Sequence, residues 1–466
     1  MSGVIASTHT NHPAPPLSRL LEHTADAVQA VRGGRSLTEI IAKVPAELRP
    51  GVQALSFHTL RWLGSASEAR ALLAPKTPPP AVDALLVTAL ALLWPGETPP
   101  YAEHTLVDQA VTAARHRTPS AAGFVNAVLR RFVREKDGIA ASVRHSPLGA
   151  YNHPLWWIER LKRDWPQDWQ ALLTGANLRP PMTLRVNARR GTGAAYVQRL
   201  AALGRGAQLL DDADDLPLGR GQGVVLAQPC PVQQLHGFAE GEVSVQDGAA
   251  QRAARLLLGA GLPSGARVLD ACAAPGGKTA HLLELADLDL LALDSDPLRL
   301  ARVQDTLNRQ HLHAELKAGD ARHPSGPNGW WDGRAFDAIL LDAPCTASGI
   351  VRRHPDVRWL RRADDINALG RIQAQMLDAL WPLLAPGGRL LYATCSIFPA
   401  EGQLQIDAFL QRLGPGKAVL EPQSPGHLLP SRDNASQGVP APPHLPHHSR
   451  STLLQDGFFY ALIRKT

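Results

Sequence analysis

The sequence predicts a multi-domain protein with an all-α N-terminal domain, a small α+β middle segment and a C-terminal domain built on a doubly wound α/β sheet. A chain of 466 residues is too long for one ordinary domain. Residues 17–140 carry apolar side chains at three- and four-residue spacing, which is typical of amphipathic helices. From Ala266 onwards, short apolar strands alternate with helical stretches, and this alternation is typical of a parallel sheet covered by helices.

The composition indicates a globular protein, because 44% of the residues are hydrophobic and 19% are charged. A net charge of +6 and a pI near 9.3 permit a polyanionic partner without requiring one. The N-terminus lacks the apolar core of a signal peptide, and the longest apolar run, residues 81–94, is too short to span a bilayer and carries Asp83. The cysteines stand at no zinc-ligand spacing. We therefore expect a cytoplasmic protein with no membrane segment and no metal, and we expect it to be a monomer.

The N-terminal domain is expected to span residues 15–145 and to consist of helices. Clusters of Pro and Gly, such as "APKTPPP" and "PGETPP", separate its periodic segments. The segments are residues 17–31, 47–63, 80–94, 101–114 and 122–136. The last of them carries Arg130, Arg131 and Arg134, for which a solvated face is favoured over a phosphate-binding face.

The middle segment is expected to span residues 146–245, beginning within a linker that reads "RHSPLGAYNHP". A helical stretch at 155–177 comes first. Residues 182–190, "MTLRVNARR", then alternate apolar and polar like an edge strand and end on Arg189 and Arg190, which are expected to extend an RNA footprint.

The C-terminal domain is expected to span residues 246–466. Parallel strands are expected at the start of the segments 266–286, 288–310, 314–322, 336–345 and 389–396, with a final strand at 457–465. The Pro-rich stretch 414–452 is expected to be a loop. It contains His444, His447 and His448, which have no acid or thiol at ligand spacing and are expected to be solvent-exposed rather than metal-binding.

An acidic residue stands at the end of four successive strands of this sheet, namely Asp270, Asp294, Asp320 and Asp342, and the fifth strand ends at Cys395. In an open parallel sheet, ligands bind beyond the carboxyl ends of the strands. A single Asp at a strand end is more often a turn or helix cap than a ligand. Four in one sheet are harder to explain in that way, so we expect these groups to gather on one rim.

Each group on this rim has an expected task. Gly276 and Gly277 leave room for a ligand near the backbone and open a helix, although the loop is neither a Walker A motif nor Gly-x-Gly-x-x-Gly. Asp294 is the expected partner of ribose hydroxyls, and Asp320 is placed to accept from an adenine amino group. Asp270 can orient the loop. Together they predict a cofactor that contains a nucleoside but no diphosphate.

Five stretches of this domain stand out as motifs: "LDACAAPGGKTAH", "ALDSDPLRL", "GDAR", "LLDAPCTASGIVRRHPDVRWLR" and "LLYATCSIFPAEG". They resemble the motifs of S-adenosylmethionine-dependent RNA 5-methylcytosine methyltransferases, and the N-terminal segment with "GFVNAVLRRF" is similar to the antitermination factor NusB. The resemblance covers nearly the whole chain. It implies a NusB-like RNA-binding domain, a Rossmann-like methyltransferase domain, S-adenosyl-L-methionine as cofactor and RNA as substrate. Within the family the chain is most similar to bacterial enzymes that act on 16S ribosomal RNA.

The resemblance also implies which residues bind the cofactor. The cofactor loop consists of Cys272, Ala273, Ala274, Pro275, Gly276, Gly277 and Lys278. Asp294 is implied as the ribose acid, Asp320 as the adenine-side acid, and Asp342 as the acid of this site that lies nearest the target base. The chain departs from the commonest form of the motifs at Gly248, often Ala, and at Ala321, often Gly, but neither change removes a functional group.

Two cysteines follow neighbouring expected strands, and the chemistry of cytosine gives both a possible role. Carbon 5 of cytosine is a poor nucleophile until a thiolate adds to carbon 6. From the residues alone, Cys345 and Cys395 are both eligible. The resemblance implies Cys395 as the nucleophile and Cys345 as the thiol that assists product release. A protonated Asp342 is expected to donate to N3 of the base, and Lys278 to lower a thiol pKa or orient the base.

Contacts to RNA are expected from residues 351–362, "VRRHPDVRWLRR", where five arginines are interleaved with His354 and Trp359. Two other functions stay open. An adenine-N6 methyltransferase would need Asn/Asp-Pro-Pro-Tyr/Phe where this chain has Asp342-Ala-Pro-Cys. A non-catalytic RNA-binding ribosome-assembly factor is the other alternative, and the presence of both thiols and all four acids argues against it.

Overall fold

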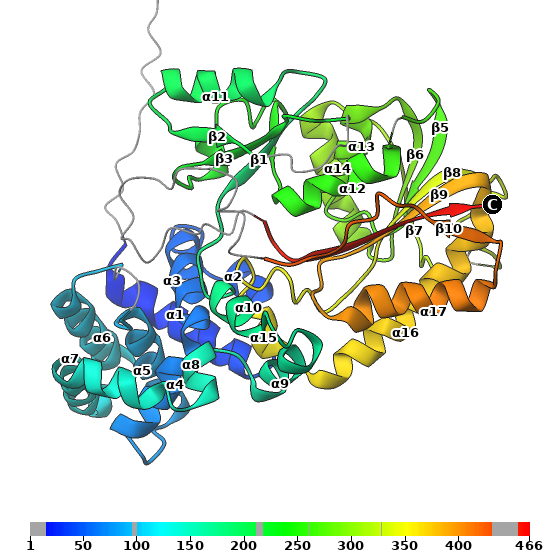
Figure 1. The fold of residues 1–466 in the computed structure, drawn as a ribbon. Helices are drawn as coiled ribbons and strands as arrows, with labels where there is room; N and C mark the ends of the chain where they lie inside the picture. The colour runs from blue at the N-terminus through cyan, green and yellow to red at the C-terminus, as the bar shows by residue number, and fades with distance from the viewer. Residues whose placement is uncertain (1–14, 96–99, 211–217, 260, 328, 431–454) are drawn as a thin grey trace, which may run out of the picture. The chain divides into compact units, whose positions relative to one another are not determined.

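The structure is a computed structural model of the full chain, and it describes residues 15–95, 100–210, 218–259, 261–327, 329–430 and 455–466. The chain divides into two compact units. The first comprises the chain up to Ile158 together with His354–Leu360, and the second comprises Glu159–Arg353 and Arg361–Thr466 (Figure 1).

The first unit is entirely helical within its described residues, as the sequence predicts. Its α-helices are α1 (Leu17–Arg32), α2 (Leu37–Ala42), α3 (Arg49–Arg61), α4 (Leu63–Leu73), α5 (Pro80–Leu92), α6 (Glu103–Arg117), α7 (Ala122–Val143), α8 (Pro147–Tyr151) and α15 (Val357–Leu360), with the 3-10 helix η1 (Pro119–Ala121). Every residue of α5 from Val82 to Leu92 is buried, so the long apolar run of the sequence is a core helix. In the part of the chain that the structure describes, no helix is both long and apolar enough to cross a bilayer.

The segment His354–Leu360 belongs to the first unit although it is distant in sequence from the rest of it. Trp359 and Leu360 pack against the apolar core of the helices. The Trp359 indole N–H donates to the carbonyl oxygen of Leu60 at 2.8 Å. The Arg358 guanidinium donates to the carbonyl oxygen of Asn152 at 3.2 Å. These contacts bind the segment to the helical core.

The second unit begins with the smaller of its two sheets. Its elements are α10 (Trp169–Gly175), β1 (Thr183–Val186), α11 (Gly193–Ala202), β2 (Ala207–Leu209), β3 (Gly223–Leu226) and β4 (Val243–Val245), with η2 (Val232–Gln234); α9 (Leu155–Asp164) leads into them. The strand order is β2-β3-β1-β4, and all three pairings are antiparallel. The prediction that β1 is an edge strand is therefore wrong. It lies between β3 and β4, and all four of its residues are buried.

The larger sheet of the second unit is doubly wound, as predicted. Its strands are β5 (Ala266–Asp270), β6 (Leu288–Asp294), β7 (Glu315–Ala318), β8 (Phe336–Asp342), β9 (Leu384–Thr394), β10 (Ala418–Leu420), β11 (Gly426–Leu428) and β12 (Phe458–Lys465). The order is β10-β12-β9-β8-β5-β6-β7, with β11 also paired to β12. The pairings among β5 to β9 are parallel, whereas β12 runs antiparallel to β9. The final strand completes the sheet, as expected.

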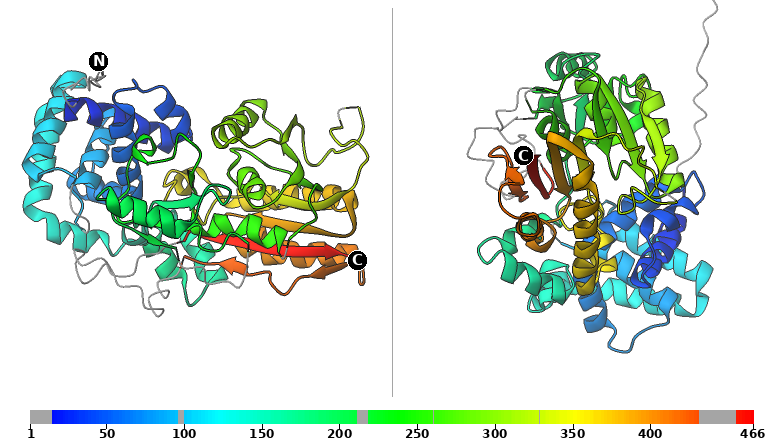
Figure 2. Two further views of the ribbon diagram at one scale, coloured as in Figure 1. Left: turned by 90° about the horizontal axis from the view of Figure 1, so that it is seen from above. Right: turned by 90° about the vertical axis from the view of Figure 1, so that its right-hand side faces the viewer.

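Helices cover both faces of this sheet (Figures 1 and 2). They are α12 (Gly248–Leu258), α13 (Gly277–Leu285), α14 (Pro297–Gln310), α16 (Ala363–Leu380) and α17 (Gln403–Leu413), with η3 (Trp381–Leu383) and η4 (Pro399–Glu401). Alternate strand residues point to opposite faces. Val268 and Leu340 belong to the apolar cluster under α12, α13 and α14, while Leu269 and Leu341 belong to the cluster that includes residues of α16 and α17.

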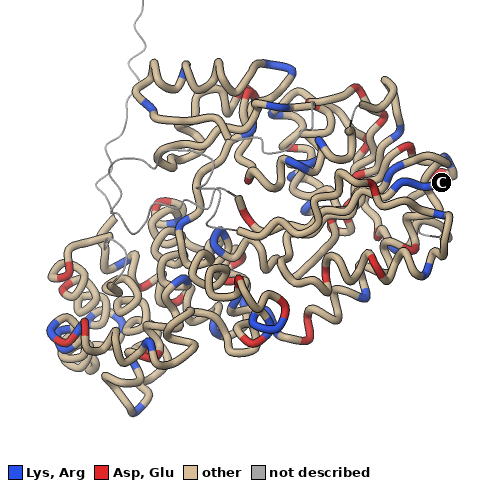
Figure 3. Tube along the Cα trace, in the orientation of Figure 1, with Lys and Arg blue, Asp and Glu red and all other residues tan. Residues whose placement is uncertain are grey.

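The Pro-rich stretch 414–452 was expected to be a loop, but its described part contains β10 and β11. Residues 431–454, with His444, His447 and His448, lie outside the described residues. Lys and Arg are interspersed with Asp and Glu along the described parts of both units (Figure 3). The domain boundaries at residues 145 and 245 stay predictions.

Candidate active site

The acids that were predicted to meet on one rim do follow neighbouring parallel strands. Asp270, Asp294 and Asp342 are the last residues of β5, β6 and β8, and Asp320 stands two residues after the end of β7. Because β8, β5, β6 and β7 are parallel neighbours in this order, their carboxyl ends lie on the same edge of the sheet.

Two thiols lie in contact on this edge. The sulfur atoms of Cys345 and Cys395 are 3.4 Å apart. Their loops follow the parallel neighbours β8 and β9, and the loops are joined by a hydrogen bond from the Gly349 N–H to the Cys395 carbonyl at 2.9 Å. Cys345 is 7% exposed, whereas Cys395 is half-buried. Cys395 is thus the more accessible of the two.

The environment of Cys345 opposes its ionisation. The contact with Cys395, burial, and the negative charge of Glu401 raise the pKa of the Cys345 thiol well above its ordinary value. Cys345 is therefore held as a neutral thiol at physiological pH.

An ion pair stands beside the thiols. The Lys278 ammonium lies 2.5 Å from a carboxylate oxygen of Asp342, and it also lies 5.5 Å from the centre of the Phe458 ring. Burial lowers the pKa of Lys278, but the Asp342 carboxylate more than offsets this, so the pKa is raised above its ordinary value. Lys278 is therefore a cation with its proton next to Asp342, of whose side chain 28% is exposed.

The cofactor loop is held by side chains of the helix α14. The Arg299 guanidinium donates to the Ala274 carbonyl at 3.2 Å, and the Thr306 hydroxyl donates to the Pro275 carbonyl at 2.9 Å. The Ala273 N–H donates to the Leu293 carbonyl at 2.9 Å, which joins the loop to β6. Hydrogen bonds to α14 and β6 thus hold the loop in a defined conformation.

Two residues of the cofactor loop have special positions. Gly276 has φ +98°, a left-handed conformation that favours glycine, and it caps the N-terminus of α13. Cys272 packs against the apolar cluster under α16 and α17, and burial raises its pKa well above the ordinary value. Cys272 therefore behaves as a packing residue, and its thiol is not poised for reaction.

Asp270 lies buried beneath the loop, with 1% of its surface exposed. One of its oxygens accepts a hydrogen bond from the Thr279 hydroxyl at 2.7 Å, while Oδ1 has no partner among the described residues. Burial raises the pKa of Asp270 to about 7. A buried carboxylate oxygen without a donor beside a glycine turn is suited to a ligand that brings a donor of its own.

Asp294 and Asp320 lie where nucleoside-binding acids are expected. Asp294 accepts from the N–H groups of Ala274 and Asp296, each at 3.1 Å. Asp320 is paired with Arg322, whose hydrogen bonds lower the pKa of the Asp320 carboxyl. A pocket of about 590 Å³ opens beside it, lined by Ser295, Ala318, Gly319, Asp320, His323, Ser325 and Pro327. Three acids and a glycine loop therefore lie on this edge. These groups fit a ligand that consists of a nucleoside and a cationic amino acid tail.

The arginines after Cys345 were expected to form an RNA-binding surface, and for Arg352 and Arg358 this is wrong, because both are buried. Arg352 pairs with the buried Asp456, of which 1% is exposed. Arg353 pairs with both Asp456 and Asp247. These guanidinium groups neutralise buried carboxylates.

The next two arginines also serve the structure. Arg358 is fully buried in the helical unit, and burial lowers its pKa to about 9. Arg361 donates to the carbonyl oxygens of Thr346 at 3.1 Å and Cys345 at 3.2 Å. Arg361 therefore holds the loop that carries the buried thiol. The sequence shows that a residue is charged but not whether it is buried. It therefore could not distinguish arginines that bind RNA from arginines that stabilise the fold.

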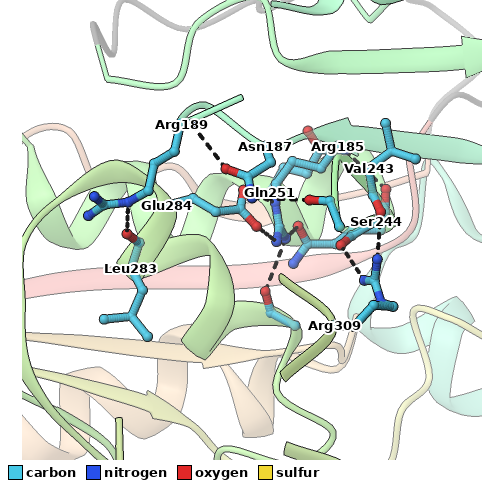
Figure 4. A network of polar contacts seen from close by, with 12 residues as sticks. Arg185, Asn187, Arg189, Val243, Ser244, Gln251, Leu283, Glu284 and Arg309 are labelled. Carbon is cyan, nitrogen blue, oxygen red and sulfur yellow. Dashed lines mark hydrogen bonds and ion pairs between the residues drawn. The ribbon is translucent and has the colours of Figure 1, made fainter. Parts of the chain in front are cut away.

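A buried arginine joins the small sheet to the cofactor loop, and sequence reasoning missed it (Figure 4). Arg185, on β1, pairs with Glu284 of α13, and the two side chains are 0% and 1% exposed. Its guanidinium also donates to the Gly277 carbonyl at 3.0 Å and to the Gln246 side chain. The available signal was a single arginine inside an apolar strand, because such a residue needs a buried partner.

Two further arginines strengthen this connection (Figure 4). Arg189 donates to the carbonyl of Leu283 at 2.7 Å, near the C-terminus of α13. Arg309, on α14, donates to the hydroxyl of Ser244 at 2.9 Å and to the carbonyl of Val243 at 3.0 Å. The Arg189 guanidinium thus caps the C-terminus of α13, and its expected contact with RNA stays a prediction.

The strand order, with five parallel strands and an antiparallel β12, together with the acids at the strand ends and the glycine turn, defines a Rossmann-like methyltransferase domain. Among the described residues, no group of three or more His, Cys, Asp or Glu side chains is arranged to hold a metal ion.

Comparison with known families agrees with this class for each part of the chain. The family described as "16S rRNA methyltransferase RsmB/F" matches residues 262–464. The "Methyltr_RsmF/B-like, ferredoxin-like domain" matches residues 153–233, and the NusB family matches residues 22–134. The N-terminal domain is thus NusB-like and the middle domain ferredoxin-like.

Curated relatives match almost end to end. A protein of Pseudomonas syringae pv. tomato named "Ribosomal RNA small subunit methyltransferase B" is 41% identical over 456 residues, which cover 95% of this chain and 96% of that protein. A protein of the same name from Escherichia coli O7:K1 is 39% identical over 453 residues, covering 94% and 96%. The chain belongs to the ribosomal RNA small subunit methyltransferase B family, and it is an S-adenosylmethionine-dependent methyltransferase.

Solved structures agree with this assignment. The structure titled "Crystal Structure of PH0851" superposes with a TM-score of 0.71 at 25% identity, and the match covers 97% of this chain and 100% of that chain. A methyltransferase homologue from Pyrococcus horikoshii superposes with a TM-score of 0.53 at 26% identity, covering 69% and 100%.

Proposed function

We propose that this enzyme methylates carbon 5 of a cytidine in 16S ribosomal RNA, through a transient bond between the Cys395 sulfur and carbon 6 of the base. The observation that carries the proposal is the pair of thiols, 3.4 Å apart, on the edge of the sheet where the cofactor loop also lies. The printed names of the relatives support ribosomal RNA of the small subunit as the substrate.

Cys395 is the nucleophile in this proposal. A thiolate that adds to carbon 6 converts the ring into an enamine and makes carbon 5 nucleophilic. Cys395 is half-buried and Cys345 is 7% exposed, so a base that enters the site reaches Cys395 more easily.

Thiolate addition places negative charge on the base, and the pair of Lys278 and Asp342 is suited to neutralise it. We expected a protonated Asp342 from the sequence. The Asp342 carboxylate, 2.5 Å from the Lys278 ammonium, raises the pKa of Lys278 and so favours its charged form. We propose that Lys278 supplies this proton through Asp342 to N3 of the base as the charge develops.

Cys345 assists release of the product. After methylation the proton on carbon 5 must leave, carbon 5 and carbon 6 must regain their double bond, and the sulfur–carbon bond must break. Cys345 gives its proton to the departing Cys395 sulfur and accepts the proton from carbon 5, so it ends the cycle as a thiol. Its raised pKa supports this role, because the proton is present when it is needed.

The cofactor would be held by the glycine loop and by the acids on the rim. Bound S-adenosylmethionine supplies an electrophilic methyl group on a sulfonium. Asp294 would accept from the ribose hydroxyls and Asp320 from the adenine amino group. Asp270 has a free oxygen beneath the loop that can accept from the amino group of the methionine part.

Transfer of tritium from labelled S-adenosylmethionine to unmodified small-subunit RNA tests the proposal. We expect Cys395→Ser to lower the rate by about 10³-fold or more, because the covalent route disappears. We expect Cys345→Ala to accumulate an enzyme–RNA adduct that survives denaturing electrophoresis. Cys230→Ser, in the ferredoxin-like domain, is the matched control and should behave as the parent.

Three outcomes contradict the proposal. A Cys395→Ser protein as fast as the parent removes the nucleophile. A product that digests to N6-methyladenosine instead of 5-methylcytidine identifies the other methyltransferase chemistry. No transfer by a folded, cofactor-binding parent favours the non-catalytic RNA-binding ribosome-assembly factor.

A further inference from the structure

A buried glutamate lies between the two loops that carry the thiols. Glu401, the last residue of η4, is 0% exposed. Its carboxylate accepts hydrogen bonds from the Thr346 N–H at 2.8 Å and from the Thr346 hydroxyl at 2.5 Å. It also accepts from the Ser396 hydroxyl at 2.6 Å and from the Gln373 amide at 3.3 Å. Four donors thus converge on one carboxylate.

Three of these four donors come from the residues that directly follow the two thiols. Thr346 follows Cys345, and Ser396 follows Cys395. One carboxylate therefore holds both loops at the position next to each sulfur atom. Among the described residues, the hydrogen bonds of the Glu401 carboxylate go to the neighbours of the thiols and to Gln373, so Glu401 positions the thiols through those neighbours.

A second line of hydrogen bonds runs between the same loops. The Ile397 N–H donates to the Ser348 hydroxyl at 2.9 Å, and the Ser348 hydroxyl is 2.9 Å from that of Ser396. Since Ser396 donates its own proton to Glu401, Ser348 donates to Ser396. The hydroxyl groups of Ser348 and Ser396 thus form a chain of hydrogen bonds that ends at the Glu401 carboxylate.

The backbone of Glu401 is fixed as well. Its carbonyl oxygen accepts from the Tyr392 hydroxyl at 2.9 Å and from the Thr394 hydroxyl at 3.2 Å, both on β9. Gln373, on α16, donates to the Pro344 carbonyl at 2.9 Å in addition to Glu401. The carboxylate is therefore anchored on the strand and the helix that flank the loops.

Glu401 is suited to act as an anion in this place. Burial raises its pKa, while the hydrogen bonds from Ser396 and Thr346 lower it, and the net change is upward. All of its four partners are donors, so neither oxygen needs a proton to satisfy them. The charge of this carboxylate is also one of the causes that keep Cys345 neutral.

We infer that Glu401 is the positioning residue of the thiol pair: its carboxylate holds the Cys345 and Cys395 loops together and so sets the 3.4 Å approach of the two sulfur atoms. The inference rests on the proposed function, because the approach matters only if both thiols act on one base. A group that sets a reacting geometry affects turnover more than binding.

Glu401→Gln tests this inference by an isosteric change. Oε1 of Glu401 accepts from the Thr346 N–H and the Gln373 amide, whereas Oε2 accepts from the Thr346 and Ser396 hydroxyls. The NH₂ group of glutamine replaces one of these oxygens and faces its donors, so at least one of the hydrogen bonds that hold the loops is lost. We expect kcat for methyl transfer to fall about tenfold to 100-fold, with KM for RNA within about twofold, since a misplacement of about 1 Å has an effect of this size. Glu421→Gln is the matched control. Glu421 pairs with Arg464 and follows β10, which β12 separates from β9, the strand before the Cys395 loop.

A second readout measures the spacing of the thiols without any catalysis. Phenylarsine oxide binds two neighbouring thiols: two arsenic–sulfur bonds form, and the oxide oxygen leaves as water with both thiol protons. The parent and Glu421→Gln should bind one equivalent, and Cys345→Ser should not. We expect Glu401→Gln to bind the arsenical at least about tenfold more weakly, because the two sulfurs no longer stand at bridging distance.

The two readouts separate the inference from the proposed function. Weaker arsenical binding by Glu401→Gln supports the positioning role even if no protein of the series methylates RNA. A folded Glu401→Gln protein with the parent's arsenical affinity and the parent's kcat overturns the role. A loss of kcat with unchanged arsenical affinity also overturns it. The carboxylate would then affect catalysis by some means other than the distance between the two sulfur atoms.

If Glu401→Gln does not fold, the pair Thr346→Val and Thr346→Ser makes the same measurement. Valine keeps the shape and the backbone N–H of Thr346 but removes the hydroxyl that donates to Glu401. Serine keeps the hydroxyl. We expect Thr346→Val to weaken arsenical binding and Thr346→Ser to restore it, and equal affinities of the two variants overturn the inference.

Discussion

At the scale of single residues, the buried carboxylate of Asp270 lowers the free energy of unfolding. Its carboxyl is buried beneath the cofactor loop, and burial raises its pKa to about 7. In the unfolded chain the pKa has the ordinary value of 3.8. Between these two values the folded protein binds a proton that the unfolded chain has lost, so stability falls as the pH rises through this range. Above pH 7 the buried carboxylate is charged, and its destabilising effect on the folded protein is complete.

We predict that Asp270→Asn stabilises the protein at pH 8 and not at pH 4. The amide keeps an acceptor for the Thr279 hydroxyl but carries no charge. The gain in unfolding free energy should approach about 4 kcal/mol at pH 8, from a shift of roughly three pKa units, and should shrink toward pH 4. Urea unfolding at pH 4, 6 and 8 checks this, with the exposed Asp305→Asn as control. A gain that is the same at all three pH values contradicts it.

The sequence predicted that the acids and thiols lie on one edge of the sheet, because their positions follow from strand ends. It could not identify Glu401, since nothing local distinguishes a glutamate that meets Thr346 from one that meets water. For the same reason Arg352 and Arg353 were assigned to RNA, although they pair with a buried aspartate far along the chain. Partners that are separated by about a hundred residues are set by the tertiary fold.

At the scale of elements, the start of α13 depends on one glycine. A Cβ atom on Gly276 would stand 3.0 Å from the Cα of Val303 on α14, and its φ of +98° is unfavourable for other residues. Gly276 thus permits both the turn and the close approach of α14.

We predict that Gly276→Ala weakens cofactor binding and destabilises the protein by about 1 to 3 kcal/mol, because backbone strain and the contact with α14 add together. Titration calorimetry with S-adenosylhomocysteine and thermal unfolding check this. Gly333→Ala is the matched control: Gly333 has φ +88° and no atom within 4 Å of the added Cβ. If both variants bind the cofactor product equally well, the contact with Val303 is not needed.

Element types were predictable from periodicity, but the positions of strands within sheets were not. β1 alternates like an edge strand because Arg185 occupies a polar place in the pattern, yet that arginine is buried against Glu284. β10 and β11 are three residues each and lie in a Pro-rich stretch. Both strands form because they pair with β12 through backbone hydrogen bonds. A local sequence pattern does not reveal such a pairing.

At the scale of the whole molecule, Arg185 connects the ferredoxin-like sheet to the methyltransferase domain. It neutralises Glu284 and holds the carbonyl of Gly277, so the small sheet supports the first turn of α13. Removing one partner of such a buried ion pair destabilises the protein strongly, because the other charge stays buried without a partner.

We predict that Arg185→Met lowers the unfolding free energy by about 3 to 5 kcal/mol, because the Glu284 charge is left buried without a partner. The double variant Arg185→Met, Glu284→Met should recover most of this stability but not the affinity for S-adenosylhomocysteine, because the bond to the Gly277 carbonyl stays absent. Urea unfolding and calorimetry check both statements. Equal stability of the single and double variants contradicts them.

Cutting the chain after Ile158 does not yield two complete pieces. A fragment that ends there lacks α15, so the helical core loses the packing of Trp359 and Leu360 against it. The complementary fragment carries that tryptophan with nothing to cover it. Genetic dissection of this enzyme therefore calls for a permuted gene in which His354–Leu360 is rejoined to the helical half, and for a short bridge between Arg353 and Arg361 in the other.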